Sequence, residues 1–399
     1  MAFNLNPILI VLVVLSGLTT TVAGILMVVK SIFLFRAQIN RSINSDLEVV
    51  RVTRLVRKEE EVAKEKDLWK DEIGSMEQLL TTLNSLKDGG SFLKTFLYGR
   101  PCISFEIANP SDSEEIFFYV SMPKKFRRSV EKQLQSYFAN AAMEICTDYS
   151  IFAPGNFVAA STLKLKRGYA LPIRTYENLE ADPLNEITNA MNKLGGAIEG
   201  AAVQVVLQPI EGSSWRTEGR RIAREMQQGK RLTDVNRSAL AGIGKEIGKS
   251  FGEVVTSGKS EKSSEEKVIQ LTPEEQELVK SIEKKASKAA LRVNVRLFAS
   301  ADTQARADEV LSYLENAFAQ YHNPEINGFI IKKRTRNKKF VFDYVFRNFQ
   351  DEDAMVLGVE EIASIFHFPI STTDTPRIRL LKSKTAPPPT NIPREGLLL

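Results

Sequence analysis

The feature that most constrains this chain is an uncharged apolar run near its N-terminus, at residues 8–29. A helix rises about 1.5 Å per residue, so about 20 apolar residues span a hydrocarbon core roughly 30 Å thick. The run therefore predicts a transmembrane anchor, which we place at residues 1–36. A cleaved signal peptide and a buried soluble helix are the alternatives. The first fits less well, because no Lys or Arg precedes the run, its length exceeds the usual limit of about 15 residues, and no small-x-small site follows.

Positive charges follow the apolar run, at Lys30, Arg36 and Arg41. Lys and Arg next to a spanning helix stay preferentially on the cytoplasmic side. We therefore expect a single-pass protein of the cell inner (cytoplasmic) membrane, with its N-terminus outside and the body after the anchor in the cytoplasm. Membrane lipid is accordingly an expected partner.

The next segment, residues 37–90, is rich in Glu, Lys, Arg and Leu and contains no Pro, which predicts a helical stalk continuing from the anchor. Some of its apolar residues alternate spacings of four and three, the pattern of a coiled-coil seam. They are Trp69, Ile73, Met76, Leu80 and Leu83. Glu59 and Lys66 interrupt the seam upstream. The stalk is therefore either a coiled coil that makes a homo-oligomer or one amphipathic helix lying on the body or the membrane.

Two stretches of alternating strand and helix patterns follow. In residues 101–212 the elements succeed one another in the order β-β-α-β-β-α-β. In residues 286–370 the strand LRVNVRLFASA and a helix precede GFIIKK and KKFVFDYVF, which we interpret as a β-hairpin, and a helix around VEEIASIF follows. This order predicts an α+β chain with two ferredoxin-like α/β sandwich modules, with helices on one sheet face.

Between these modules, residues 213–285 carry many charges, glycines and serines and few large apolar residues. We interpret them as a charged helical linker or insertion. It is expected to hold helices near residues 213–228 and 232–255. A third helix should begin at Thr272-Pro273, where Thr caps the helix and Pro occupies its first turn.

The chain offers few residues for catalysis or metal binding. Two cysteines, Cys102 and Cys146, and two histidines, His322 and His367, are scattered along it. We expect buried free thiols, a helix-end contact for the first histidine and packing between aromatics for the second. The run IGKEIGKS differs from a phosphate-binding loop, because Ile243 stands where the first Gly is needed and no strand precedes it. We therefore expect no cofactor, no metal and no enzymatic activity.

The net charge of +5 is mild for 399 residues and by itself requires no polyanionic partner. Cations are nevertheless clustered where the predicted hairpin has its tip. They are Lys332, Lys333, Arg334, Arg336, Lys338 and Lys339. Such a ribbon suits the phosphates of nucleic acid, anionic lipid heads or an acidic protein, whereas a solvated tip without a ligand is the simpler alternative. The tip has no stacking aromatics, so base-specific recognition is not expected.

Several stretches of the sequence carry a resemblance to a known family. Among them are FEIANPSDSEEIFFYVSMPKKF, YENLEADPLNEITNAMNKL and VNVRLFASADTQARADEVLSYLENAF. The most specific are EEIASIFHFP and APPPTNIPREGLLL, the latter in a proline-rich tail at residues 371–399. Over most of residues 100–399 the chain resembles the membrane-proximal, non-motor N-terminal region of bacterial type IV secretion and conjugation ATPases of the HerA/FtsK-like class.

In that family the proline-rich segment leads into a RecA-like motor with a phosphate loop, whereas this sequence stops at Leu399. The family's ATP hydrolysis is therefore not carried over; the motor is expected to be a separate polypeptide, or the sequence a fragment of a longer chain. The resemblance implies a membrane-anchored non-catalytic component of a DNA or protein transfer machine. Such a component would dock an ATPase motor at the cytoplasmic face, with other machine subunits and nucleic acid as further partners. The alternative is an envelope scaffold that binds proteins and has no role in nucleic-acid transfer.

Overall fold

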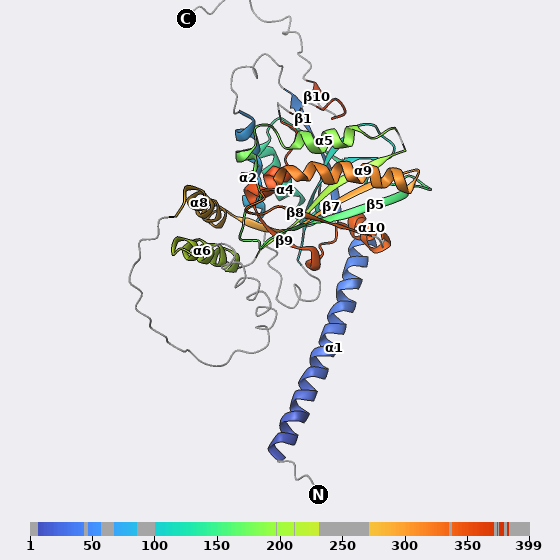
Figure 1. Ribbon diagram of the computed structural model, residues 1–399. Coiled ribbons are helices and arrows are strands. Elements are labelled where there is room, and N and C mark those ends of the chain that lie inside the picture. The colour runs from blue at the N-terminus through green and yellow to red at the C-terminus, as the bar shows by residue number, and fades with distance from the viewer. Residues whose placement is uncertain are drawn as a thin grey trace, which may run out of the picture.

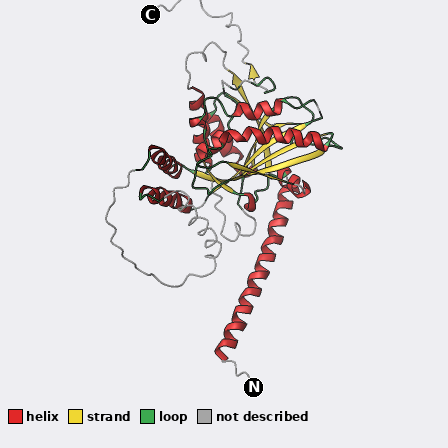
Figure 2. Cartoon of the chain, viewed as in Figure 1, coloured by secondary structure: helices red, strands yellow, loops and turns green. Residues whose placement is uncertain are grey.

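A mostly antiparallel sheet forms the centre of the chain, and one long helix projects from it (Figures 1 and 2). The computed structural model describes residues 7–43, 47–56, 68–85, 100–196, 198–210, 212–230, 271–334, 337–370, 373, 375–378 and 381–382. Within these ranges the sheet has 10 strands in the order β10-β1-β3-β2-β6-β7-β5-β8, with β4 also paired to β1 and β9 to β7. Among the described strands, β1 and β10 alone pair in parallel, and a parallel bridge outside the strands joins Ile116 to Ile378. The expected α+β class is therefore confirmed.

The strands come from both predicted modules. They are β1 (Leu47–Val56), β2 (Ile103–Asn109), β3 (Phe117–Pro123), β4 (Ala141–Cys146), β5 (Phe157–Leu165), β6 (Gly200–Pro209), β7 (Ala290–Ala301), β8 (Phe329–Lys333), β9 (Met355–Gly358) and β10 (Leu381–Lys382). β6, from the first region, pairs with β7, from the second, along the whole length of β6. Two ferredoxin-like modules are therefore not confirmed, because strands of both regions are hydrogen-bonded in one sheet.

Five helices cover one face of this sheet and enclose the main hydrophobic core. They are α2 (Leu68–Leu83), α4 (Arg127–Tyr137), α5 (Leu184–Asn192), α9 (Gln304–Ala317) and α11 (Val359–Ile365). The short 3-10 helices are η2 (Lys124–Phe126), η3 (Tyr176–Asn178), η4 (Phe318–Tyr321) and η5 (Asp351–Asp353). The opposite face carries α10 (Asn337–Val345), which lies on the side from which α1 projects, whereas α5 and α9 lie on the far side (Figure 1).

Helix α1 (Pro7–Ile43) stands apart from the body as a lone helix (Figure 1). Its segment Leu12–Phe33 is long and apolar enough to cross a membrane, a property that a signal sequence shares. Hydroxyl groups inside this segment donate to backbone carbonyls one turn earlier, as Thr20 does to Ser16 at 3.0 Å, so they fit an apolar environment. Lys30 lies inside this segment, near its C-terminal end; the side chains of Arg36 and Arg41 lie outside the described residues.

The predicted helical stalk is wrong where the structure has strand β1. The sequence LEVVRVTRLV is rich in β-branched residues, which favour a pleated, half-buried strand over a helix. Val50 and Val52, two residues apart, point into the main core, and β1 pairs with both β3 and β4. Tertiary pairing thus overrides the charged, helix-forming composition of the surrounding segment. Residues 57–67 and 86–90 of the predicted stalk lie outside the described residues.

The apolar seam of the predicted stalk lies on α2, inside the body. Its members are Trp69, Ile73, Met76, Leu80 and Leu83, which are all buried in the main core. The spacing is therefore that of an amphipathic helix lying on the body, which was one of the two alternatives. A side chain buried in this core is not available to form a coiled coil.

The predicted linker contains two helices that pack against each other, α6 (Ser214–Gln227) and α8 (Pro273–Ser287). Thr272 caps α8 as expected: its hydroxyl accepts from the backbone N–H of Glu275, whose carboxylate accepts from the backbone N–H of Thr272. The helix predicted at residues 232–255, and the proline-rich tail beyond residue 382, lie outside the described residues.

Candidate functional site

The cations singled out in the sequence lie on an edge strand and at the start of a helix. Lys332 and Lys333 are exposed on β8, the last strand of the sheet order, and Lys338 and Lys339 are exposed in the first turn of α10. We call these four lysines the β8–α10 basic surface. Arg336 lies outside the described residues. The predicted hairpin is wrong, because KKFVFDYVF forms a helix.

Aromatic contacts explain why this segment is helical. Phe340 and Tyr344 are one helical turn apart and both pack on Phe298 of β7, with ring centroids 5.0 Å and 4.4 Å from that ring. Residues four apart share a face in a strand as well as in a helix, so the local pattern fits both. Burial of both rings against the second sheet face decides in favour of the helix.

Arg334 is turned away from the basic surface. Its guanidinium pairs with Asp353 and lies 5.2 Å from the ring centroid of Phe340. Lys164 Nζ also contacts the Asp353 carboxylate, at 3.1 Å. The first turn of α10 carries no acidic residue, so its backbone N–H groups add partial positive charge to that of the lysines.

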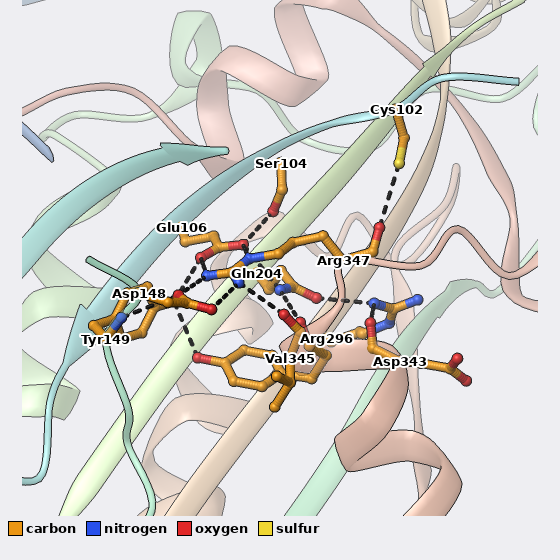
Figure 3. Close-up of polar contacts among 11 residues, drawn as sticks. Cys102, Ser104, Glu106, Asp148, Tyr149, Gln204, Arg296, Asp343, Val345 and Arg347 are labelled. Carbon is orange, nitrogen blue, oxygen red and sulfur yellow. Dashed lines mark hydrogen bonds and ion pairs between the residues drawn. The ribbon is translucent and has the colours of Figure 1, made fainter. Parts of the chain in front are cut away.

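A buried polar network lies under α10 (Figure 3). Glu106 on β2, Gln204 on β6 and Arg296 on β7 are direct cross-strand neighbours, and each is at most 1% exposed. Gln204 Nε2 donates to Glu106 Oε1 at 2.9 Å, and Arg296 Nη1 donates to Gln204 Oε1 at 2.9 Å. The three side chains form a continuous polar row across three strands. Arg296 and Gln204 also donate to backbone carbonyls of α10.

Arg347, two residues after α10 ends, closes this network (Figure 3). Its Nε donates to Glu106 Oε1 at 3.1 Å, while Nη1 and Nη2 donate to Asp148 at 2.6 Å and 2.7 Å. Its φ of 52° is in the left-handed region, where helices usually end on Gly. An arginine at that position places a charged side chain over the sheet, where Gly would remove the arginine that donates directly to the Glu106 carboxylate.

The Glu106 carboxyl and the two arginine side chains of this network are ionised at neutral pH. Burial alone would raise the pKa of Glu106, but the charge of Arg347 and its hydrogen bonds, with one from Ser104, hold that pKa below its usual value. Burial raises the pKa of Tyr149, whose hydroxyl donates to Glu106 Oε2 at 2.6 Å. Burial lowers the pKa of Arg296 to about 10. At neutral pH a buried carboxylate therefore lies between two arginines that stay charged.

These contacts make the network a clamp for α10. It joins three strands to the helix through backbone and side-chain bonds, and its polar groups are satisfied by one another. Such an arrangement fixes the direction in which α10 leaves the sheet, and with it the positions of Lys338 and Lys339. The exposed lysines are the groups available to a ligand.

A second ionic group lines a cavity of about 660 Å³ beside α8. Lys285 Nζ lies 2.8 Å from Glu361 of α11, and both side chains are buried. Lys288 bridges Glu360 of α11 and Glu77 of α2, at 2.7 Å and 2.8 Å. Burial would raise the pKa of Glu360, but hydrogen bonds from Lys288, Thr175 and Lys284 hold it below its usual value. These pairs join three helices to one another.

The histidines and cysteines have structural contacts. His367 is buried, with Nε2 2.9 Å from Asp182 and Nδ1 2.8 Å from the carbonyl of Ala363. Neither Cys102 nor Cys146 forms a disulfide; Cys102 is buried, as expected, and donates to the carbonyl of Arg347 at 3.3 Å, whereas Cys146 is half-buried. Throughout the part of the chain that the structure describes, no group of three or more His, Cys, Asp or Glu residues could hold a metal ion. The IGKEIGKS run lies outside that part.

Sequence reasoning missed the buried network because its members resemble an outward-facing stripe. In ISFEIAN, Glu106 alternates with Phe105 and Ile107, which is typical of a strand with one solvated face. The available signal was the repetition of polar residues at matching positions of three central strands. That signal becomes visible only when the strand pairing is known.

Comparison with known proteins gives a family but no described activity. No curated protein matches the chain. The sequence model of a family described as domain of unknown function (DUF8128) matches residues 56–380, which include β2 to β9 and all helices between them. Because this match covers well over half of the 399 residues, the chain belongs to the DUF8128 family.

Proposed function

We propose that this chain is a membrane-tethered, non-catalytic component of a DNA or protein transfer machine, which docks an ATPase motor at the cytoplasmic face. Helix α1 would serve as a retained anchor in the inner membrane, and the positive charges after its apolar segment favour a cytoplasmic body. The resemblance to the non-motor region of secretion and conjugation ATPases supplies the class of machine.

The observation that carries the proposal is the β8–α10 basic surface. Four exposed lysines lie on β8 and in the first turn of α10, whose N-terminus lacks acidic residues, and the clamp below holds that helix to the sheet. Of the two on β8, Lys332 is on the sheet face that α10 covers, and Lys333 is on the other face. Like charges brought together at a helix N-terminus oppose the helix dipole, and a bound anion would relieve that repulsion. Phosphates of nucleic acid or carboxylates on a motor partner have the required charge.

Two measurements on the full chain in detergent test this proposal. The first is co-purification with a motor ATPase from the native membrane; recovery as a stable monomer without such a partner would count against motor docking. The second is binding of short single-stranded and double-stranded DNA over a series of salt concentrations. Four lysine contacts predict a slope of log affinity against log salt of about −3 to −4.

A matched pair of variants assigns DNA binding to the surface. The test variant is Lys332→Gln/Lys333→Gln/Lys338→Gln/Lys339→Gln, which is expected to abolish most of the salt dependence. The control removes four exposed cations elsewhere, on or near α6 and α8: Arg220→Gln/Arg224→Gln/Lys230→Gln/Lys280→Gln. Equal losses in the two variants would indicate a general charge effect and contradict the assignment to β8 and α10.

A second candidate, an envelope scaffold that binds proteins only, is favoured by apolar side chains on the same edge strand. Ile330 and Ile331 are 47% and 43% exposed on β8, which pairs with β5 along one side. An exposed edge strand is a template for pairing with another chain. No DNA binding at low salt, together with partner binding that Ile331→Lys abolishes, would favour the scaffold over the transfer machine.

A further inference from the structure

A second group of exposed cations lies near the start of β1, the strand that follows the proposed membrane anchor in the chain. Helix α1 ends at Ile43 and β1 begins at Leu47, so these two Cα atoms are at most about 15 Å apart. In the sheet, Leu47 is paired with Pro123 at the end of β3. The residues directly after Pro123 therefore lie at the end of the body that the tether enters.

Those residues are strongly basic. The exposed cations are Lys124 and Lys125 in η2 and Arg128 and Lys132 in α4, and we call them the tether-side basic patch. The nearby carboxylates of Glu48 and Glu131 both contact Arg127, at 3.3 Å and 2.9 Å. The carboxylates of Glu48 and Glu131 thus pair with Arg127, and the side chains of Lys124, Arg128 and Lys132 are exposed at the surface.

The turn that carries the patch is fixed by packing. Phe126 is half-buried against the main core, in a narrow apolar recess that Leu83, Leu207 and Leu291 also line. Lys125 Nζ lies 4.8 Å from the centroid of the Phe126 ring. Because the ring is held in place, the cationic side chains on either side of it stay at the surface.

The geometry of the tether brings this patch close to lipid heads. From Phe33, the end of the apolar segment, to Ile43 the helix adds about 15 Å, and the headgroup layer occupies about 5–7 Å of that rise. The remaining distance is about one Debye length at physiological salt, about 8 Å. The surface potential of an anionic leaflet therefore extends to the end of the body.

We propose that the tether-side basic patch binds the phosphate headgroups of anionic lipids in the membrane that holds α1, and so orients the body on that membrane. This inference rests on the proposed anchor but not on motor or DNA binding. Each Lys or Arg near an anionic surface strengthens association about fivefold.

The test uses the full chain in lipid nanodiscs, either zwitterionic or containing phosphatidylglycerol. Acetylation rates of individual lysines are measured by mass spectrometry. Anionic lipid is expected to slow the labelling of Lys124, Lys125 and Lys132 about fivefold, and high salt should reverse the effect. Lys230 and Lys280 are the internal controls. Equal rates in the two kinds of disc, or equal slowing at the control lysines, would overturn the proposal.

Variants supply a second readout. Anionic discs are expected to raise the unfolding midpoint of the wild-type chain, because a ligand of the native state stabilises it. The change Lys124→Gln/Lys125→Gln/Arg128→Gln/Lys132→Gln should abolish that difference, and the control variant on α6 and α8 should keep it. A difference that persists in the patch variant would contradict lipid binding at this site.

Three further outcomes distinguish lipid binding from nucleic-acid binding, from the proposed anchor and from the proposed function. Protection of Lys124 and Lys125 by a short DNA duplex in zwitterionic discs, with none from anionic lipid, would assign the patch to nucleic acid and overturn the lipid assignment. Release of the wild-type chain from membranes by alkaline carbonate would overturn the anchor and this inference together. Failure of motor and DNA binding, with lysine protection intact, would overturn only the proposed function.

Discussion

Removing Arg347 should destabilise the body far more than removing an exposed arginine. In the Arg347→Met variant the carboxylate of Glu106, which is 0% exposed, loses its donors at 3.1 Å and 3.2 Å. Loss of one partner from a buried ion pair costs about 3–5 kcal/mol. Glu106 keeps hydrogen bonds from Ser104, Gln204 and Tyr149, so we expect the low end of that range, about 3 kcal/mol.

The reverse change should cost less. In Glu106→Gln the side-chain shape is retained and Arg347 keeps two bonds to Asp148, whose side chain is 47% exposed. A buried hydrogen bond that loses its charge assistance costs about 1–2 kcal/mol. The double variant should cost less than the sum of the single changes by about 1–3 kcal/mol, because each change removes the same contact.

Denaturant unfolding of the full chain in detergent measures these free energies through the fluorescence of Trp69 and Trp215, which are both buried. Arg128→Met is the matched control, an exposed arginine whose loss should change stability by no more than about 0.5 kcal/mol. A cost below about 1 kcal/mol for Arg347→Met, or strict additivity in the double variant, would refute the clamp.

Three other outcomes are expected. The pKa of Glu106 is lower in the folded chain than in the unfolded chain. The stability that this carboxylate adds is therefore complete above the unfolded pKa of about 4.3 and is lost as the pH falls through the lower folded pKa. In Glu106→Gln, the free energy of unfolding measured over a pH series should fall less steeply on the acid side. Met76→Ala should cost about 2–5 kcal/mol, since this side chain is fully buried; a change in sedimentation without lost stability would instead support a coiled coil. Thr272→Ala should cost about 1 kcal/mol in urea unfolding by removing the cap of α8, and an unchanged midpoint would argue against that cap.

The elements that sequence reasoning found are those whose periodicity and burial agree. On α9 the apolar side chains at helical spacing, Ala307, Val310 and Leu314, are buried, and Thr303 caps the helix by accepting from the backbone N–H of Arg306 at 3.3 Å. A 3.6-residue period over fourteen residues has no competing interpretation as a strand. Helix and core could therefore be assigned together.

The elements it missed are those whose local pattern fits two structures. LEVVRVTRLV was assigned to a stalk because charged residues surround it. In the structure this segment is strand β1, whose backbone is hydrogen-bonded to β3 and to β4. KKFVFDYVF was assigned to a strand of a hairpin, and its aromatic residues Phe340, Phe342 and Tyr344 alternate with other residues, as they would in a strand. In both cases the partner surface, remote in sequence, decides between a period of 2 and a period of 3.6.

The candidate site follows the same logic. A cluster of lysines can be read from a sequence, so the basic surface could be located. The buried contacts that fix its position could not be predicted. Glu106 and Arg347 are 241 positions apart, and their pairing depends on a strand order in which β2 lies beside β6 and then β7. A lone Glu in an alternating strand is ordinarily solvated. Here a helix covers that face, so the carboxylate requires an arginine. The left-handed backbone conformation of Arg347 places its guanidinium beside Glu106. No local pattern in the sequence could therefore identify the residues that position the basic surface.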